Sequence, residues 1–195
     1  MSRAPKIKIP PEAKRFVECA RRYCALVGEH EKTPIRELLA ALHVLLPELY
    51  ARGVALPDIE SSDDLFRRDR KHNVRSWTKV RNGLYRRLGR RTHYMKVFDA
   101  YDRVARGSTV GLLCVDFADI YVDVAEGLRL WDADERADAI YQWRWSAKHH
   151  WGDHAVAAIA ALHWLRENHD YGPPPPMPSD KTRKLAATVT RSRKV

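Results

Sequence analysis

Apolar residues along this chain recur at intervals of three and four, and almost no stretch alternates between apolar and polar positions. Intervals of three and four mark one face of an α-helix, whereas alternation would indicate a half-buried strand. The sequence therefore predicts an all-α fold of about five helices. They are expected at 12–27, 34–53, 66–91 and 110–131, followed by a last and longest helix that runs to about Asn168.

Several residues mark where these helices begin and end. Pro34 suits a first helical turn, where its missing N–H breaks no hydrogen bond. Ser108 or Thr109 is expected to cap the fourth helix, and Asp132 or Asp134 the last one. Pro47 lies inside the second helix, so a kink or a restart is expected there.

The chain of 195 residues suits a single domain with its own core, and we find no internal repeat. The proline run in "YGPPPPMP" ends helical structure, and the sequence after it lacks a sizeable apolar face. We predict an N-terminal extension (1–11), a helical-bundle domain (12–170) and a disordered basic C-terminal tail (171–195).

The charge is unevenly distributed. The formal net charge is +10, yet residues 65–96 contain 12 Lys or Arg against the single acidic residue Asp69. Residues 97–170 are acidic overall, with 13 Asp or Glu against 7 Lys or Arg. A basic segment and a basic tail thus flank an acidic helical region.

Composition also excludes some classes of protein. No run approaches the roughly 18 apolar residues that a membrane span needs, and the N-terminus lacks the apolar core of a secretory signal. Cys19, Cys24 and Cys114 have no metal-binding spacing, and three thiols cannot all pair with one another. We therefore expect reduced thiols, a cytoplasmic protein and no membrane partner.

The segment "KHHWGDHAVAAIAALHW" (148–164) holds four histidines on what the pattern predicts to be one helix. At about 100° per residue, His150 and His154 lie on one shoulder of the apolar face. His149 and His163 lie on the opposite shoulder. Only His150 and His154 can therefore face one common point.

An acidic stripe is predicted on the preceding helix. Asp116, Asp119, Asp123 and Glu126 fall beside the core face of residues 110–131. The short "DADE" connection favours antiparallel packing of the two helices, which would bring the carboxylates to the imidazoles.

Three interpretations of these two stripes remain open. The first is a structural seam of Asp–His hydrogen bonds. The second is a divalent metal site, and the third is two solvated stripes that never meet. A metal site would use His150, His154, Asp119 and Asp123.

The basic segment has two interpretations as well. Trp77 and Tyr85 follow the core period of a helix, so the segment can be an apolar stripe with a solvated cationic face. Alternatively, its cations bind phosphate backbones and its aromatic rings stack on bases. The candidate anion or nucleic-acid contacts are Arg67, Arg68, Arg70, Lys71, Arg75, Lys79, Arg86 and Arg90.

Four stretches, "LLPELYARGVALPD", "YMKVFDAYD", "DFADIYVDVAEGLRLWD" and "RWSAKHHWGDHAVAAIAALH", carry a resemblance. In this order they resemble a family of small bacterial helical proteins catalogued only as a domain of unknown function, over about residues 15–168. The resemblance implies a compact helical bundle and no assigned activity or cofactor. His149, Asp153 and the expanded basic segment depart from the shared pattern. The motif positions are Asp119, Asp123, Trp131, Arg144, His150, Trp151, Gly152 and His154.

The leading hypothesis is a non-catalytic protein-interaction or accessory/regulatory module that acts through an unknown protein partner and needs no cofactor, since no phosphate loop or nucleophile motif is present. Whether the chain is an enzyme is left open. One alternative is a metal-dependent hydrolase with the Asp/His site, in which Arg144 holds an anion. The other is a nucleic-acid-binding protein that uses residues 67–96 and the tail.

Overall fold

The computed structural model describes residues 7–62, 71–97 and 108–176. These residues form a helical bundle with one small hairpin, which confirms the all-α prediction. The α-helices are α1 (Pro11–Gly28), α2 (Ile35–Val54), α3 (Lys71–Leu88), α4 (Leu113–Asp132), α5 (Arg136–His149) and α6 (Trp151–His169). The 3-10 turns are η1 (His30–Lys32) and η3 (Gly89–Thr92), and the strands are β1 (His93–Lys96) and β2 (Thr109–Leu112).

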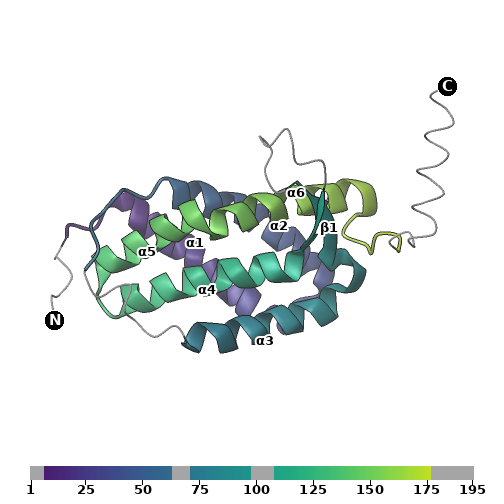
Figure 1. Cartoon of the computed structure of the whole chain (residues 1–195), viewed down its shortest axis with the longest axis horizontal. Coiled ribbons are helices and arrows are strands. Elements are labelled where there is room, and N and C mark those ends of the chain that lie inside the picture. Colours follow the sequence, from purple (N-terminus) through teal and green to yellow (C-terminus); the bar gives the residue numbers. More distant parts are fainter. Residues whose placement is uncertain (1–6, 63–70, 98–107, 177–195) are drawn as a thin grey trace, which may run out of the picture.

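Helix α4 is the centre of the bundle. It packs against α1, α3, α5 and α6, while α2 packs against α1 and α6. In Figure 1, α4 runs lengthwise with α3 along one side and with α5 and α6, end to end, along the other. A residue on α4 can therefore meet side chains from several other helices.

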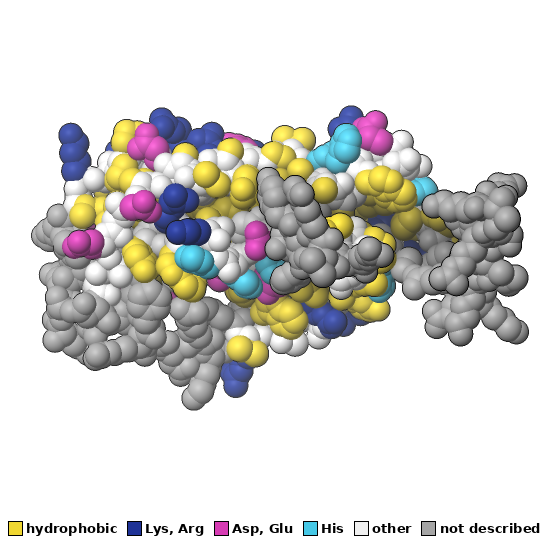
Figure 2. All heavy atoms as spheres, turned by 45° about the horizontal axis from the view of Figure 1, so that its top comes forward, with side chains coloured by type: hydrophobic (Ala, Val, Ile, Leu, Met, Phe, Trp, Pro, Cys, Tyr) yellow, Lys and Arg dark blue, Asp and Glu magenta, His cyan; other side chains and the backbone are white. Residues whose placement is uncertain are grey.

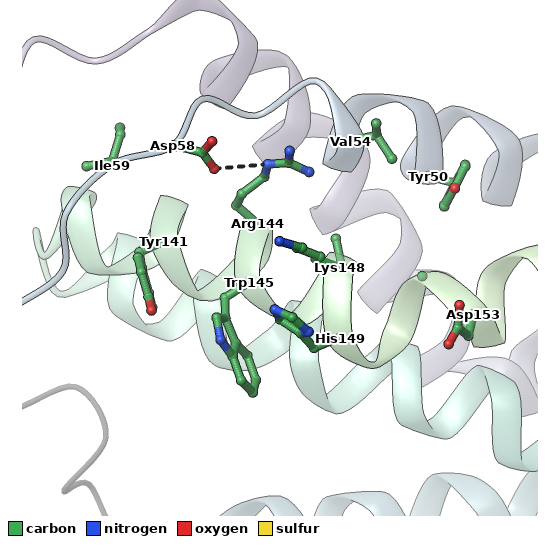
Figure 3. Close-up of a pocket in the computed structure, with 12 residues that line it drawn as sticks. Tyr50, Val54, Asp58, Ile59, Tyr141, Arg144, Trp145, Lys148, His149 and Asp153 are labelled. Atoms are coloured by element: carbon green, nitrogen blue, oxygen red, sulfur yellow. Dashed lines mark ion pairs between the residues drawn. The ribbon is translucent and has the colours of Figure 1, made fainter.

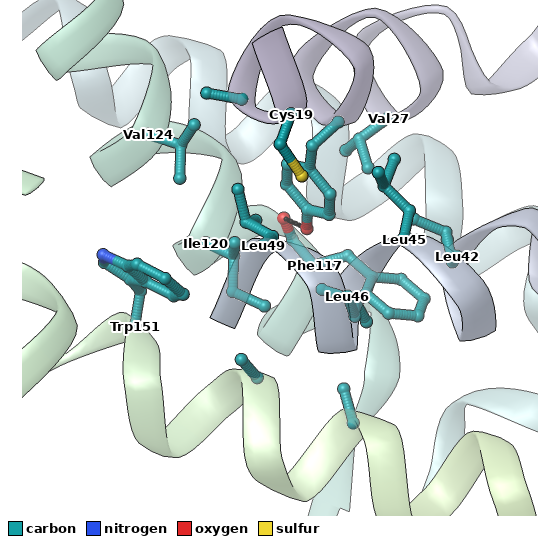
Figure 4. Close-up of a cluster of buried hydrophobic side chains, with 14 of the residues drawn as sticks. Cys19, Val27, Leu42, Leu45, Leu46, Leu49, Phe117, Ile120, Val124 and Trp151 are labelled. Atoms are coloured by element: carbon teal, nitrogen blue, oxygen red, sulfur yellow. Dashed lines mark hydrogen bonds between the residues drawn. The ribbon is translucent and has the colours of Figure 1, made fainter. Parts of the chain in front are cut away.

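The core follows the predicted apolar faces. Leucines of α2 meet Phe117 and Ile120 of α4 in the cluster shown in Figure 4, and all of them are buried. Each buried side chain of this size contributes about 1.5–3 kcal/mol relative to an exposed one. Tyr23 lies in the same core and donates its hydroxyl hydrogen bond to the carbonyl oxygen of Phe117 over 3.0 Å. The apolar spacing thus identified the buried faces correctly.

The prediction of one continuous last helix is wrong. The helix breaks at His150 (φ −150°, ψ −83°), which ends α5 and precedes α6. Gly152 makes the break feasible, because a Cβ there would lie 2.1 Å from the backbone oxygen of Ala147. His150 consequently stands at the junction of two helices.

The predicted start of the fourth helix is also wrong. Thr109 opens β2, which pairs antiparallel with β1, and α4 begins only at Leu113. In this hairpin Tyr94 stands opposite Gly111. Pro47 does not interrupt α2, and it is exposed, so the carbonyl that loses its helical partner lies on the solvent side.

The structure also bears on the predictions about membrane spans, cysteines and the tail. The helices of the described segments include none that is both long and apolar enough to cross a membrane. Cys19, Cys24 and Cys114 are unpaired. Burial, with the nearby Glu48 carboxylate as a smaller cause, raises the pKa of the Cys19 thiol to about 12, so it stays protonated at neutral pH. The predicted tail beyond residue 176 lies outside the described residues.

Candidate metal centre

The acidic stripe of α4 and the histidines at the α5–α6 junction do meet. His150 Nδ1 lies 2.7 Å from Asp123 Oδ2, and His154 Nδ1 lies 2.8 Å from Asp116 Oδ1. Both distances fit a hydrogen bond in which the imidazole N–H donates to the carboxylate. The solvated-stripe interpretation is thereby excluded. Figure 2 shows histidine and acidic side chains next to one another on this face of the molecule.

His150 is the more accessible of the two imidazoles. Its side chain is 45% exposed, whereas that of His154 is 21% exposed. The hydrogen bond to Asp123 raises the pKa of His150, against a smaller opposing effect of burial, and the Asp119 and Asp153 carboxylates add to the increase. An arriving metal ion would compete with this proton for the imidazole.

His154 is held by a deeper pair of polar groups. The Asp116 carboxylate is almost fully buried, and its second oxygen accepts a hydrogen bond of 2.7 Å from the Tyr94 hydroxyl. The hairpin positions this tyrosine: a Cβ on Gly111 would lie 2.4 Å from the Tyr94 ring, so only glycine leaves room for it. The imidazole orientation at His154 is thus fixed through two further side chains.

Asp119 reaches the same place from α4. Its Oδ1 accepts a hydrogen bond of 2.7 Å from the indole Nε1 of Trp77 on α3. Its Oδ2 lies 3.5 Å from His154 Nε2. Burial raises the pKa of the Asp119 carboxyl, while His154 and the Trp77 hydrogen bond oppose that effect.

One ligand atom each from Asp119, His150 and His154 lies within 4.8 Å of the other two. Two ligands bound tetrahedrally to zinc at about 2.0–2.1 Å are about 3.3–3.4 Å apart. The 3.5 Å between His154 Nε2 and Asp119 Oδ2 is close to that separation and is long for a direct hydrogen bond. His154 and Asp119 are therefore spaced as two ligands of one ion would be, and His150 offers a third ligand atom within 4.8 Å of both.

The comparisons with known proteins bear on the fold. The family model described as "Domain of unknown function (DUF5063)" matches residues 7–168. The chain belongs to this family. It is also similar to the crystal structure of protein BF1032 from Bacteroides fragilis, with a TM-score of 0.62 and 18% identity over 80% of this chain and 92% of that one. That likeness shows a shared fold. Among curated proteins no match was found.

Within this DUF5063 domain, the sequence anticipated part of the cluster. Of the four predicted ligands, His150, His154 and Asp119 lie close together, while Asp123 pairs with Nδ1 of His150 and is not among the three. Glu126, the last member of the acidic stripe, pairs with Arg129 on its own helix.

Two residues of the cluster were not predicted as part of an Asp/His site: Trp77, considered only for core packing or base stacking, and Tyr94. Trp77 follows the core period of its helix, so nothing in its spacing sets it apart from a packing residue. Tyr94 belongs to a four-residue strand whose partner lies beyond a long connection. A tyrosine opposite an isolated glycine is the signal that could have indicated it.

Arg144, the predicted anion clamp, lines a different site. A cavity of about 450 Å³ lies beside the α5–α6 junction, and its lining includes Arg144, Lys148 and His149 but none of the three converging residues. In Figure 3, Arg144 points to Asp58, with which it forms an ion pair at 3.4 Å, while His149 points to the other side of α5. Arg144 is therefore not positioned to serve the Asp/His cluster.

The predicted cationic contacts fall into three groups. Arg67, Arg68 and Arg70 lie outside the described residues, as does the side chain of Lys71. Arg90 donates to the carbonyl oxygen of Pro174. The remaining three, Arg75, Lys79 and Arg86, are exposed on α3.

Proposed function

We propose that this protein binds one divalent transition-metal ion through Asp119, His150 and His154, and acts as a metal-dependent hydrolase. A single observation carries the proposal. Each of the three side chains has one heteroatom held by a neighbouring residue, and one ligand atom of each lies within 4.8 Å of the other two. Metal-binding histidines typically show this arrangement, with a carboxylate on the second ring nitrogen.

The outer contacts give each candidate ligand a defined role. With Nδ1–H donating to a carboxylate, His150 and His154 present the Nε2 lone pair, which is the atom that binds a metal. The hydrogen bond to Asp123 raises the pKa of His150, which makes this imidazole a better ligand. Trp77 occupies one oxygen of Asp119, which directs the other toward the centre.

The three candidate ligands in the described part of the chain favour a hydrolytic function over a structural one. Structural zinc sites have four protein ligands, whereas catalytic sites have three and keep a position for water. The half-exposed His150 side chain places this centre within reach of solvent. A bound ion would lower the pKa of its water toward neutrality and supply a nucleophile for an ester or phosphate bond.

Two earlier interpretations compete with this proposal. An Asp–His seam without metal would use the same hydrogen bonds to stabilise the bundle. The protein-interaction module remains a prediction, and it assigns no role to these three residues. The seam and the metal centre differ in one measurable respect, because only the metal centre predicts zinc binding that depends on Asp119.

The test is a zinc titration of untagged, chelator-treated protein against a chromophoric competitor. We expect one equivalent bound by the native chain, and at least about 100-fold weaker binding by His150→Ala and Asp119→Asn, since each loses a direct ligand. His149→Ala is the matched control and should bind as the native chain does. A native chain that binds no zinc, manganese or iron would exclude the proposal.

If zinc binds as expected, hydrolysis of chromogenic phosphate and carboxylate esters is then measured with and without the ion. Activity that returns with zinc in the native chain, and not in Asp119→Asn, supports the hydrolase. Stoichiometric zinc with no activity toward any ester would reduce the function to metal binding.

A further inference from the structure

The outer face of α3 carries a row of cations. Arg75, Lys79 and Arg86, here called the α3 cation stripe, are spaced by four and seven residues. At about 100° per residue they fall within an arc of about 40°. The buried Leu84 and Leu88 of the same helix lie about 180° away. In Figure 1, α3 runs along one edge of the bundle, so this face is directed to solvent.

The cations of the stripe are not paired with acidic side chains of the described residues. Toward the described part of the chain, none of its three side chains forms an ion pair or a side-chain hydrogen bond. The neighbouring Arg87, Arg90 and Arg91, in contrast, donate to backbone carbonyl oxygens of other segments. Residues 71–97 contain no Asp or Glu. The fold therefore uses some arginines of this region as structural donors and leaves the stripe exposed.

We propose that the α3 cation stripe binds the phosphate backbone of a nucleic acid. Arg75 and Arg86 are eleven residues apart, which corresponds to about 16.5 Å along a helix axis. A duplex carries a phosphate about every 3.4 Å of its axis on each strand, so the stripe spans about five phosphates. The guanidinium groups at both ends suit bidentate contact with phosphate oxygens. Contacts of this kind hold a nucleic acid without reading its sequence.

The side chains between the cations favour this ligand over an anionic membrane. Thr78 and Asn82 lie on the stripe side of α3, and both are polar, whereas the exposed Val74 and Tyr85 lie about 80–100° around the helix from Arg75, on one flank only. A helix that lies in a membrane surface needs large apolar side chains beside its cations, to insert among the lipids. A polar row with spaced cations fits a surface that is bound without insertion.

The stripe is separate from the proposed metal centre. Trp77, which holds Asp119, projects about 200° around the helix from Arg75. Removal of the stripe should therefore leave zinc stoichiometry unchanged, and loss of zinc should leave nucleic-acid binding unchanged. The two proposals can fail independently.

The experiment measures fluorescence anisotropy of a short labelled duplex with the full chain over a salt series. The variant R75E/K79E/R86E is compared with K14E/K32E/R166E, which makes the same change in net charge at exposed positions on other helices. We expect the stripe variant to bind at least about 10-fold more weakly, with a log–log salt slope lower by about 2 to 3, since each lost phosphate contact removes about 0.9. The control variant should stay within about twofold of the native chain.

Three results would overturn the proposal. The first is equal weakening in both triple variants, which would indicate only non-specific attraction. The second is no binding of duplex by the native chain. The third is stripe-dependent binding of phosphatidylserine vesicles that exceeds binding of the duplex, which would assign the stripe to a membrane. Far-ultraviolet circular dichroism of both variants confirms that the exposed substitutions leave the helices folded.

Discussion

Trp77 and Asp119 are 42 residues apart in the sequence, and a hydrogen bond of 2.7 Å joins the indole nitrogen of one to the carboxylate of the other. It ties α3 to α4 and leaves Asp119 Oδ2 at 3.5 Å from His154 Nε2. The ligand geometry of the proposed centre thus depends on a helix that supplies no ligand.

Trp77→Phe tests this dependence. Phenylalanine keeps most of the packing volume but cannot donate to Asp119, so the carboxylate loses its orientation. Loss of such an outer contact typically lowers metal affinity 10–100-fold, and we expect zinc binding to weaken by about that factor in the competition assay. Trp145→Phe, at a partly exposed tryptophan of α5, is the control and should leave zinc affinity unchanged.

The α5–α6 junction gives a prediction about stability. Gly152→Ala would place a Cβ 2.1 Å from the Ala147 backbone oxygen, and backbone cannot move aside as a side chain can. We expect a loss of about 3 kcal/mol in the free energy of unfolding, measured by urea denaturation. Gly89→Ala is the comparison: its φ of +54° is strained for alanine, but the space around it is open. Its cost should be about 1 kcal/mol. A larger loss of unfolding free energy for Gly89→Ala than for Gly152→Ala would contradict this account of the junction.

Much of the architecture was predictable, because helix period and burial are local and repetitive. The apolar faces of α4 and α6 follow from that period, and so do the positions of Asp119 and His154 beside those faces. The break at His150 could not be predicted in this way, since no proline marks it. Gly152 indicates a break only when the position of the Ala147 backbone oxygen is known. Trp77 and Tyr94 hold Asp119 and Asp116 through hydrogen bonds between segments that are distant in the sequence. The pattern of a single helix does not predict such contacts.

The loop after α2 is anchored by a buried carboxylate. The backbone N–H and the hydroxyl of Ser62 both donate to Asp138 on α5, each at 2.7 Å. Asp138→Ala removes both acceptor oxygens, so the backbone N–H and the hydroxyl of Ser62 both lose this partner. We expect a loss of about 2 kcal/mol in unfolding free energy. Glu18→Ala, on an exposed side chain of α1, should cost almost nothing; equal costs would show that the anchor contributes little.

A pH dependence follows from His30, which is buried against Gly83 of α3. Burial lowers its pKa, and the Arg87 guanidinium lowers it further. Between the lowered pKa of the folded state and about 6.5, the usual histidine value, the unfolded chain binds more protons at this site. His30 therefore contributes its full stability above about pH 6.5 and loses it as the pH falls toward the folded pKa.

His30→Leu removes this titration. We expect the melting temperature of the native chain to fall more steeply between about pH 7 and pH 5 than that of the variant, because the other titrating groups are common to both. Parallel curves for the two proteins would show that His30 does not titrate on unfolding. The experiment is run in chelator, so that metal binding does not contribute.

The central claim is that Asp119, His150 and His154 converge on one metal ion. An anomalous difference map from crystals of the zinc-loaded protein, collected at the zinc edge, tests this most directly. We predict a single strong peak about 2.0–2.2 Å from one nitrogen of each imidazole and one Asp119 oxygen, with Asp123 and Asp116 still on the far nitrogens. A peak elsewhere, or zinc bound by the far nitrogens after the Asp–His pairs have separated, would contradict the account.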